Sequence, residues 1–298
     1  MLLNKKAQLS TTHKNFYKDC LRWLEKLSST DVNFKDQSIL NEFKITESGD
    51  IFQGQVENEY SNGFGIWFTS QNDIVEGKFT NGIISQGEAK ILYKNGEYYT
   101  GQVSKNGVRN GHGIYYYSNQ DVYDGQFVDN IRIGKSRLRF NDGSEYIGQF
   151  MDDQADGHGI YTDIKGNRYM SLSGENETGE FRNNGNFLRG RLYGLGELNF
   201  KNGDYYKGLF KGTKRDGYGE MRYYTPDHNM DISQLGEYLG YWKQDKREGQ
   251  GKMQYLNNWF FTGTWKQDQK YYGEYTFPDN SSYQGYFAND KFEGFGTM

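Results

Sequence analysis

Residues 146–159 read YIGQFMDDQADGHG, and this stretch holds the pattern that decides the fold. An aromatic residue stands two positions before Gly148, a second one stands two positions after it, and Gly157 and Gly159 follow as Gly-x-Gly. The same phrase returns along most of the chain, with clear further copies that begin at Tyr99, Tyr206 and Tyr238. A unit this short cannot bury a core alone, so the sequence predicts a stacked array of repeats.

This phrase resembles the MORN repeat, whose family pattern is Tyr-x-Gly-x-Phe/Trp followed by Gly-x-Gly. The resemblance runs from about residue 51 to residue 298, where the last copy is incomplete. In copies two, four and six, Ala89 replaces a glycine, Gly134-Lys135-Ser136 replaces Gly-x-Gly, and Glu177 replaces the opening aromatic residue. About ten copies are present, and they open at Phe52, Val75, Tyr99, Tyr123, Tyr146, Glu177, Tyr206, Tyr238, Phe261 and Tyr283.

Each copy is predicted to form one β-hairpin. Side chains alternate along a strand, so Tyr146 and Gly148 share one face of the first strand, and Gly157 and Gly159 share one face of the second. A ring can then lie over a bare glycine of the neighbouring strand, which offsets the weakness of glycine in a strand. The pairs between hairpins accept the positive φ of tight turns. Examples are Asn95-Gly96, Asp142-Gly143 and Asn202-Gly203.

The predicted fold is all-β, an elongated, twisted antiparallel meander of about ten MORN hairpins over residues 49–298, behind a short N-terminal helical segment in residues 1–48. Twenty strands at ~4.8 Å separation predict a length on the order of 90 Å. The longer steps between copies indicate insertions around residues 164–178, 183–191 and 225–236.

The N-terminal segment carries an apolar stripe at helical spacing, which predicts an amphipathic helix. The stripe consists of Phe16, Cys20, Leu24 and Leu27, with Trp23 beside them, and a second, shorter helical turn is indicated by Ile39, Leu40 and Phe43. Terminal repeats of arrays need a cap, so one interpretation is a cap over the open edge of the first strand. The other interpretation is a docking helix for a partner.

Composition argues against most kinds of chemistry. A formal charge of -4 is not typical of a nucleic-acid binder, and the single Cys20 excludes an intramolecular disulfide and indicates a reducing compartment. His112 and His158 stand in the middle of Gly-x-Gly, where other copies carry aromatic, aliphatic or amide residues, so we expect a surface position and no metal ligand. No catalytic set and no cofactor site is predicted. Solvation explains the carboxylates at 152, 153 and 156.

One candidate binding site is a basic stripe. Lys135, Arg137 and Arg139 alternate and are predicted to project from one face of a strand, with Arg132 nearby. Arg189 and Arg191 are predicted to repeat that alternation. Such a stripe suits acidic lipid headgroups or acidic protein tails. The alternative is a solvated face balanced by acids.

The MORN resemblance implies a non-enzymatic scaffold that binds other proteins of a large assembly, in the cytoplasm or cytoskeleton and most readily in a ciliary axoneme, such as a radial spoke. Two alternatives stay open: a module that binds phosphoinositides at a membrane surface, and the regulatory N-terminal part of a larger enzyme, such as a phosphatidylinositol phosphate kinase. The unfinished hairpin at residue 298 also predicts self-association through the C-terminal edge.

Overall fold

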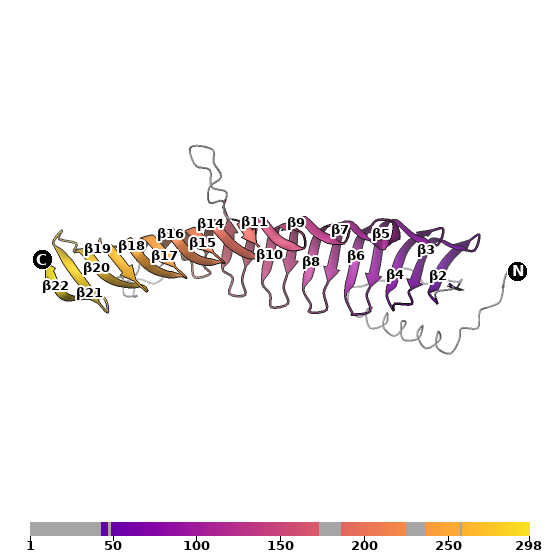
Figure 1. Ribbon diagram of the computed structural model, residues 1–298, viewed down its shortest axis with the longest axis horizontal. Coiled ribbons are helices and arrows are strands. Elements are labelled where there is room, and N and C mark those ends of the chain that lie inside the picture. The colour runs from indigo at the N-terminus through magenta and orange to yellow at the C-terminus, as the bar shows by residue number, and fades with distance from the viewer. Residues whose placement is uncertain (1–42, 47–48, 173–185, 225–235, 257) are drawn as a thin grey trace, which may run out of the picture. The chain divides into compact units, whose positions relative to one another are not determined.

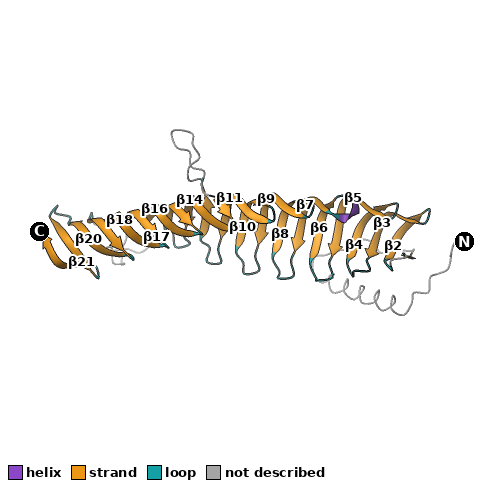
Figure 2. Ribbon diagram, viewed as in Figure 1, coloured by secondary structure: helices purple, strands orange, loops and turns teal. Residues whose placement is uncertain are grey.

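The computed structural model describes residues 43–46, 49–172, 186–224, 236–256 and 258–298. These residues form β-strands joined by turns, together with one short 3-10 helix, η2 (Lys105–Gly107) (Figure 2). The predicted all-β fold is confirmed. The helix predicted around residues 16–27, the predicted opening of copy six at Glu177 and most of the insertion at 225–236 lie outside the described residues.

The chain divides into two compact units, Met1–Ile131 and Arg132–Met298, and in each unit the strands follow one another as an antiparallel meander (Figure 1). The first unit contains β1 (Phe43–Ile45), β2 (Ile51–Glu57), β3 (Tyr60–Phe68), β4 (Ile74–Thr80), β5 (Ile83–Leu92), β6 (Tyr98–Val103), β7 (Arg109–Tyr116) and β8 (Val122–Val128). The second contains β9 (Ile131–Arg139), β10 (Glu145–Met151), β11 (Gln154–Thr162), β12 (Arg168–Ser171), β13 (Asn186–Leu188), β14 (Arg191–Asn199), β15 (Tyr205–Lys211), β16 (Lys214–Arg222), β17 (Gly236–Lys243), β18 (Lys246–Tyr255), β19 (Phe260–Lys266), β20 (Gln269–Thr276), β21 (Ser282–Ala288) and β22 (Lys291–Thr297).

The opening and closing aromatic side chains of the repeats gather on one face of each unit, which we call the ring face, and the opposite side is the outer face. The ring of Tyr238 is fully buried and meets Trp242 and Trp265 edge to face, with centroids 5.1 and 5.4 Å away. Trp265 in turn meets Phe261 at 5.2 Å. Each ring therefore joins its own hairpin to the next, and this chain of edge-to-face contacts forms the core.

The glycines of the repeat make room for these rings. A Cβ atom at Gly148 or at Gly159 would lie 2.4 Å from the Tyr146 hydroxyl oxygen, well inside van der Waals contact. The two glycines are direct cross-strand partners, and the Tyr146 hydroxyl donates a hydrogen bond to the Gln149 carbonyl at 3.1 Å. The prediction that a ring covers bare glycine is confirmed.

Gly157 has a different role from Gly159. The register between β10 and β11 shifts after Gly148, and Gly157 adopts a left-handed φ of +87° at this bulge. A Cβ at Gly157 would collide with the Gln149 side chain on the outer face, and the Gln149 amide oxygen accepts a hydrogen bond from the His158 N–H at 3.1 Å. The prediction that Gly157 shares the ring-covered face is wrong, because the left-handed φ at the bulge directs a Cβ of this residue to the outer face.

Two kinds of turn connect the strands. Within a hairpin, Asp152 and Asp153 both have positive φ, 49° and 64°, which is the geometry of a type I′ turn. Between hairpins, Gly143 has φ 90° and its N–H donates to the Phe140 carbonyl at 3.0 Å. The positive φ predicted for the Asn-Gly and Asp-Gly pairs is confirmed at their glycines, since Gly96 and Gly203 also have a positive φ.

Copy six differs from its predicted register. Tyr169 of β12 pairs with Leu198 of β14, and Phe187 of β13 pairs with Leu192 of the same strand. Both β12 and β13 also pair with β11, so together they occupy one strand position, with residues 172–185 inserted between them. The copy therefore opens at Tyr169, and the two insertions predicted at 164–178 and 183–191 are a single one.

The edge of β2 is paired in the structure. Phe43, predicted to lie in a helical turn, is instead the first residue of β1 and lies opposite Gln53, while Ile45 lies opposite Ile51. Along Ile51 to Gln53, this edge of β2 is therefore paired with β1. A cap by the N-terminal segment is not required over that part of the edge.

The buried tyrosines predict a loss of stability in alkaline solution. Burial raises the pKa of Tyr98 from 10.0 to about 12, and also raises the pKa of Tyr99, Tyr146 and Tyr238. Between pH 10 and about 12 the unfolded chain releases protons that the folded chain keeps, so the free energy of unfolding falls as pH rises. We expect the urea midpoint to decline above pH 10. Phenolate absorbance of these rings that develops before the β-sheet circular dichroism is lost would contradict this result.

Candidate functional site

The outer face of β9 carries part of the predicted basic stripe. Lys135, Arg137 and Arg139 are all exposed on that face, while Ser136 and Leu138 point to the other side. The Arg137 Nε lies 2.6 Å from Oε1 of Glu145 on β10. The alternation predicted for these three cations is confirmed, and one of them is already paired with an acid.

The other three residues of the predicted stripe lie elsewhere. The Arg132 side chain lies over the Phe150 ring, and its Nε donates to Asp153 Oδ1 at 3.1 Å. Arg189 occupies a turn with φ 50°, so it does not repeat the strand alternation, and Arg191 is the first residue of β14. Strands β10 and β11 and the β12/β13 position separate β14 from β9. The stripe is therefore reduced to the three residues of β9.

Arg132 belongs to a recurring structural contact, which we call the arginine clamp. Near the start of a hairpin's second strand, a cation lies over an aromatic ring of the next hairpin and binds the turn of that hairpin. Arg247 shows the geometry most fully, with its guanidinium carbon 4.2 Å from the Trp265 centroid, its Nε 3.3 Å from Asp268 Oδ1 and its Nη2 2.9 Å from the Asp268 carbonyl. The arginine clamps are Arg109–Asn130, Arg132–Asp153, Arg215–Asp245 and Arg247–Asp268. A fifth pair, Lys270–Asp290, repeats only the contact with the next turn, because Lys270 lies over rings of its own strand and of β18.

The clamps assign a structural role to carboxylates that the sequence analysis explained by solvation alone. Asp153 accepts hydrogen bonds from both the backbone N–H and the Nε of Arg132. In the Lys270–Asp290 pair, burial lowers the pKa of Lys270, although Asp290 acts in the opposite direction. Four of the five pairs are separated by 20 or 21 residues, and this constant spacing is the signal by which the sequence could have revealed them.

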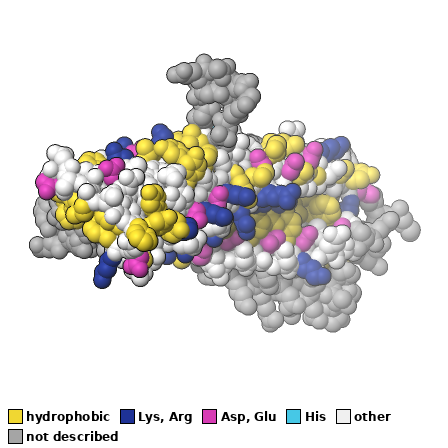
Figure 3. Space-filling model, turned by 60° about the vertical axis from the view of Figure 1, so that its left-hand side comes forward, with side chains coloured by type: hydrophobic (Ala, Val, Ile, Leu, Met, Phe, Trp, Pro, Cys, Tyr) yellow, Lys and Arg dark blue, Asp and Glu magenta, His cyan; other side chains and the backbone are white. Residues whose placement is uncertain are grey.

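The outer face of the second unit exposes two pairs of tyrosines, Tyr218 with Tyr241 and Tyr272 with Tyr286, and we call these four residues the outer row. Tyr218 and Tyr241 are cross-strand partners on β16 and β17, with ring centroids 5.3 Å apart and exposures of 48% and 51%. Tyr272 and Tyr286 form a second pair on β20 and β21, 4.8 Å apart. Figure 3 shows hydrophobic side chains gathered on the surface toward the C-terminal end. The sequence analysis identified the middle of Gly-x-Gly as a variable surface position that can carry aromatic residues, but it did not predict that these rings pair with tyrosines of the neighbouring strand.

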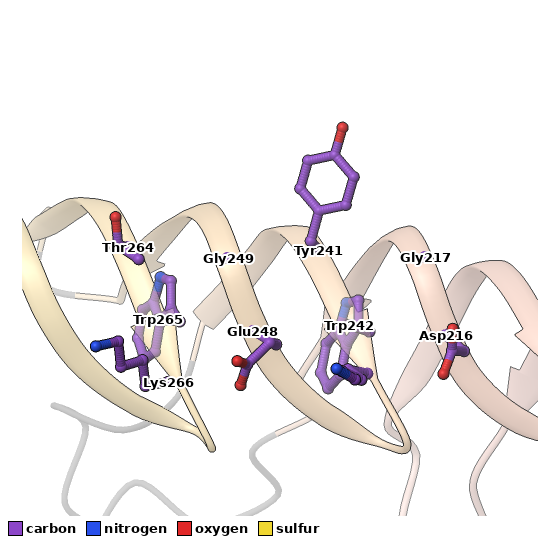
Figure 4. Close-up of a pocket in the computed structure, with 10 residues that line it drawn as sticks. Asp216, Gly217, Tyr241, Trp242, Glu248, Gly249, Thr264, Trp265 and Lys266 are labelled. Atoms are coloured by element: carbon purple, nitrogen blue, oxygen red, sulfur yellow. The ribbon is translucent and has the colours of Figure 1, made fainter.

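A shallow hollow of about 420 Å³ lies beside Tyr241 (Figure 4). In several repeats, the residue that follows the glycine of the first strand covers the glycine at the bulge of the second strand. Gln102 covers Gly111 in this way, and Leu209 covers Gly217. Tyr241 occupies the same position but its ring packs against Tyr218, so a Cβ added at Gly249 would meet only the Tyr241 Cβ, at 3.6 Å. The hollow is lined in part by Tyr241, Gly249, Thr264 and Trp265.

The two candidate histidines lie on the outer face. His112 is exposed and its Nε2 lies 3.0 Å from Asp124 Oδ1, and His158 is exposed beside Ser171. Among the residues that the structure describes, no group of three or more His, Cys, Asp or Glu side chains is arranged to hold a metal ion. Within the same residues, no helix has the length and apolar character needed to cross a membrane.

Comparison with known proteins identifies the repeats. The family model described as MORN repeat matches residues 99–122, 123–145, 146–168, 206–225, 238–259, 261–282 and 283–298. No curated protein matches the sequence.

Solved structures with a similar fold include the TCP10 domain of Danio rerio CPAP in complex with a peptide of Danio rerio STIL. It is 12% identical, with a TM-score of 0.42, over 86% of this chain and 97% of that chain. The TCP domain of Drosophila melanogaster SAS-4, in complex with a proline-rich motif of Ana2, is 11% identical, with a TM-score of 0.32, over 64% of this chain and 89% of that one.

Proposed function

Because this chain belongs to the MORN repeat family, we propose that it is a non-enzymatic scaffold that binds partner proteins in a cytoskeletal assembly, such as the radial spoke or a related complex of a ciliary axoneme. The repeated sheet is the scaffold, and the outer row is the docking surface. Self-association through β22, whose residues are all exposed, is a further part of this proposal.

The outer row is the main observation that supports a protein-binding function. Isolated exposed apolar side chains are ordinary on protein surfaces, but contiguous ones mark interaction sites. Here two pairs of adjacent tyrosines stand on one face of strands β16 to β21, and the hydrogen-bonded Gln250 and Thr264 lie between the two pairs, near the hollow beside Gly249. Tyrosine offers a large contact area with few rotatable bonds and is enriched among residues that dominate binding energy. The row therefore suits a partner segment that presents apolar side chains to it.

The test compares two double variants of the tagged full-length chain in the cells from which the sequence comes. Tyr218→Ser with Tyr241→Ser removes one tyrosine pair of the row. The matched control is Tyr60→Ser with Tyr224→Ser, which removes two tyrosines that are 54% and 57% exposed outside the row. We expect the wild-type chain and the control to remain with the detergent-insoluble axoneme or cytoskeleton and the row variant to be released. Equal retention of both variants would contradict the row as the docking surface, and a wild-type chain absent from that fraction would contradict the proposed assembly.

A second candidate function rests on the three exposed cations of β9. Such an arrangement suits anionic headgroups, with about 1 kcal/mol of attraction per cation near an acidic membrane. If Lys135, Arg137 and Arg139 bind lipid, their joint replacement by glutamate will abolish binding to vesicles containing phosphatidylinositol 4,5-bisphosphate at low salt, where exposed charges are least screened. Replacement of the exposed Lys201, Lys211 and Lys214 by glutamate changes the net charge equally and is the control. Equal binding by both triple variants would exclude this function.

A further inference from the structure

The outer face of the first unit differs from that of the second. One end of its strands carries an apolar series on the face opposite the rings, which we call the buried row. Each member is the cross-strand partner of the next, from β2 to β6. The buried row consists of Ile51, Phe68, Ile74, Leu92 and Tyr98, which are exposed by 0%, 0%, 3%, 2% and 6%.

Matched positions of the second unit are mostly polar, and Phe260 of β19, which is the apolar exception, is only half-buried. The partners Arg139 and Glu145 occupy this place on β9 and β10. Across β14 to β17 the corresponding partners are Asn199, Tyr205, Arg222 and Glu237, and the last two are exposed. The apolar character is therefore not a requirement of the repeat. In the first unit, by contrast, five successive apolar side chains form an interior surface.

We propose that the chain's own N-terminal segment, residues 16–27, packs along the buried row. The contact is made by the apolar stripe that the sequence predicts in this segment. The stripe of Phe16, Cys20, Leu24 and Leu27, with Trp23 beside them, needs an apolar partner surface. The edge of β2 from Ile51 to Gln53 is not that partner, because β1 already occupies it. The buried row is an apolar surface on the same unit.

The dimensions of the two surfaces agree. A helix of residues 16–27 is ~18 Å long at 1.5 Å per residue. Five adjacent strands at ~4.8 Å separation place the ends of the buried row ~19 Å apart. The row begins on β2, beside β1, so the chain that precedes Phe43 starts next to it. Residues 28–42 span up to ~50 Å when extended, so the connection does not limit the docking.

This docking has a consequence for partner binding. When the N-terminal segment lies on the outer face of the first unit, other proteins cannot bind to the part of that face that it covers. Partner docking is then restricted to the outer row of the second unit. The inference itself does not depend on the proposed function, since it concerns only contacts within the chain.

The experiment uses Cys20, the single cysteine of the chain, as a probe. A second cysteine is introduced in the full-length protein at the buried row, as Ile74→Cys or, in a separate variant, Leu92→Cys. The control is Thr276→Cys, at the matched strand end of β20 in the second unit. Each variant is treated with a short bis-maleimide, after circular dichroism has shown that it is folded, and cross-links are mapped by mass spectrometry.

We expect an intramolecular link from Cys20 to the cysteine introduced in the Ile74→Cys or Leu92→Cys variant, and none to the control position. In the otherwise wild-type chain, Cys20 should react with a monofunctional maleimide more than about tenfold more slowly than in urea, because the packed segment must open first. Links between two copies would instead assign the row to a second molecule. Absence of links at both row positions, with Cys20 as reactive as in urea, would overturn the proposal and leave the row to a partner protein. If both row variants fail to fold, Cys20 reactivity in the wild-type chain decides alone.

Discussion

Replacement of Gly148 by valine is expected to lower the free energy of unfolding by ~1–3 kcal/mol, the usual cost of forcing extra methyl groups into a packed core. A Cβ at this position would lie 2.4 Å from the Tyr146 hydroxyl oxygen and 2.6 Å from the Gly159 Cα. The Gly159 Cα is backbone of the paired strand, so the clash cannot be relieved by rotating one side chain. The expected readout is a lower urea midpoint with an unchanged slope.

The matched control for this prediction is His158→Ala, in the strand opposite. His158 is exposed on the outer face, away from Tyr146, and substitutions at such positions usually change stability by less than ~0.5 kcal/mol. The two variants therefore probe the two faces of the same hairpin. Equal shifts of the urea midpoint would contradict the assignment of the faces.

The ring and glycine pairs could be predicted because they follow from the period of two alone. Tyr146, Gly148 and Gly159 stand at positions whose face is determined once the hairpin is recognised. Gly157 could not be assigned in the same way, since β11 has two extra residues between the pairs Gly148–Gly159 and Phe150–Ala155, and the left-handed φ of Gly157 directs a Cβ to the other face. In sequence the two glycines of Gly-x-Gly look alike, and only the φ of +87° distinguishes them.

The candidate site was predictable to a smaller extent, for a related reason. The three cations of β9 lie within one regular strand, so their alternation is visible in the sequence. Arg189 was misplaced because the strand of copy six is split by an insertion, which moves the turn to Arg189 and Gly190. Arg132 was misassigned because its partner, Asp153, lies 21 residues away in the next hairpin. Contacts between hairpins depend on the exact register of the turns, which composition and spacing do not provide.

The arginine clamp leads to the second prediction of large effect. Arg247→Ala is expected to lower the free energy of unfolding by ~2–3 kcal/mol, because it removes charge-assisted hydrogen bonds and a cation–π contact together. The guanidinium carbon lies 4.2 Å from the Trp265 centroid, and the side chain is only 20% exposed, so water does not replace these contacts. Loss of the side chain also uncovers the Trp265 ring and frees the turn that contains Asp268. Arg247→Lys keeps the charge but not the planar fork, so its effect should be intermediate.

Arg222→Ala is the control, because Arg222 is also an ion-paired strand arginine of the second unit. Its Nε lies 2.6 Å from Glu220 Oε1 and 3.2 Å from Glu237 Oε1, yet its side chain is 58% exposed and it belongs to none of the clamps. Exposed ion pairs exchange readily for water, so no measurable change of the urea midpoint is expected. The comparison separates stacking and burial from charge pairing as such. If both alanine variants shift the midpoint equally, the clamp is no more than another surface ion pair; if only Arg247→Ala does so, the contacts between successive hairpins stabilise the array.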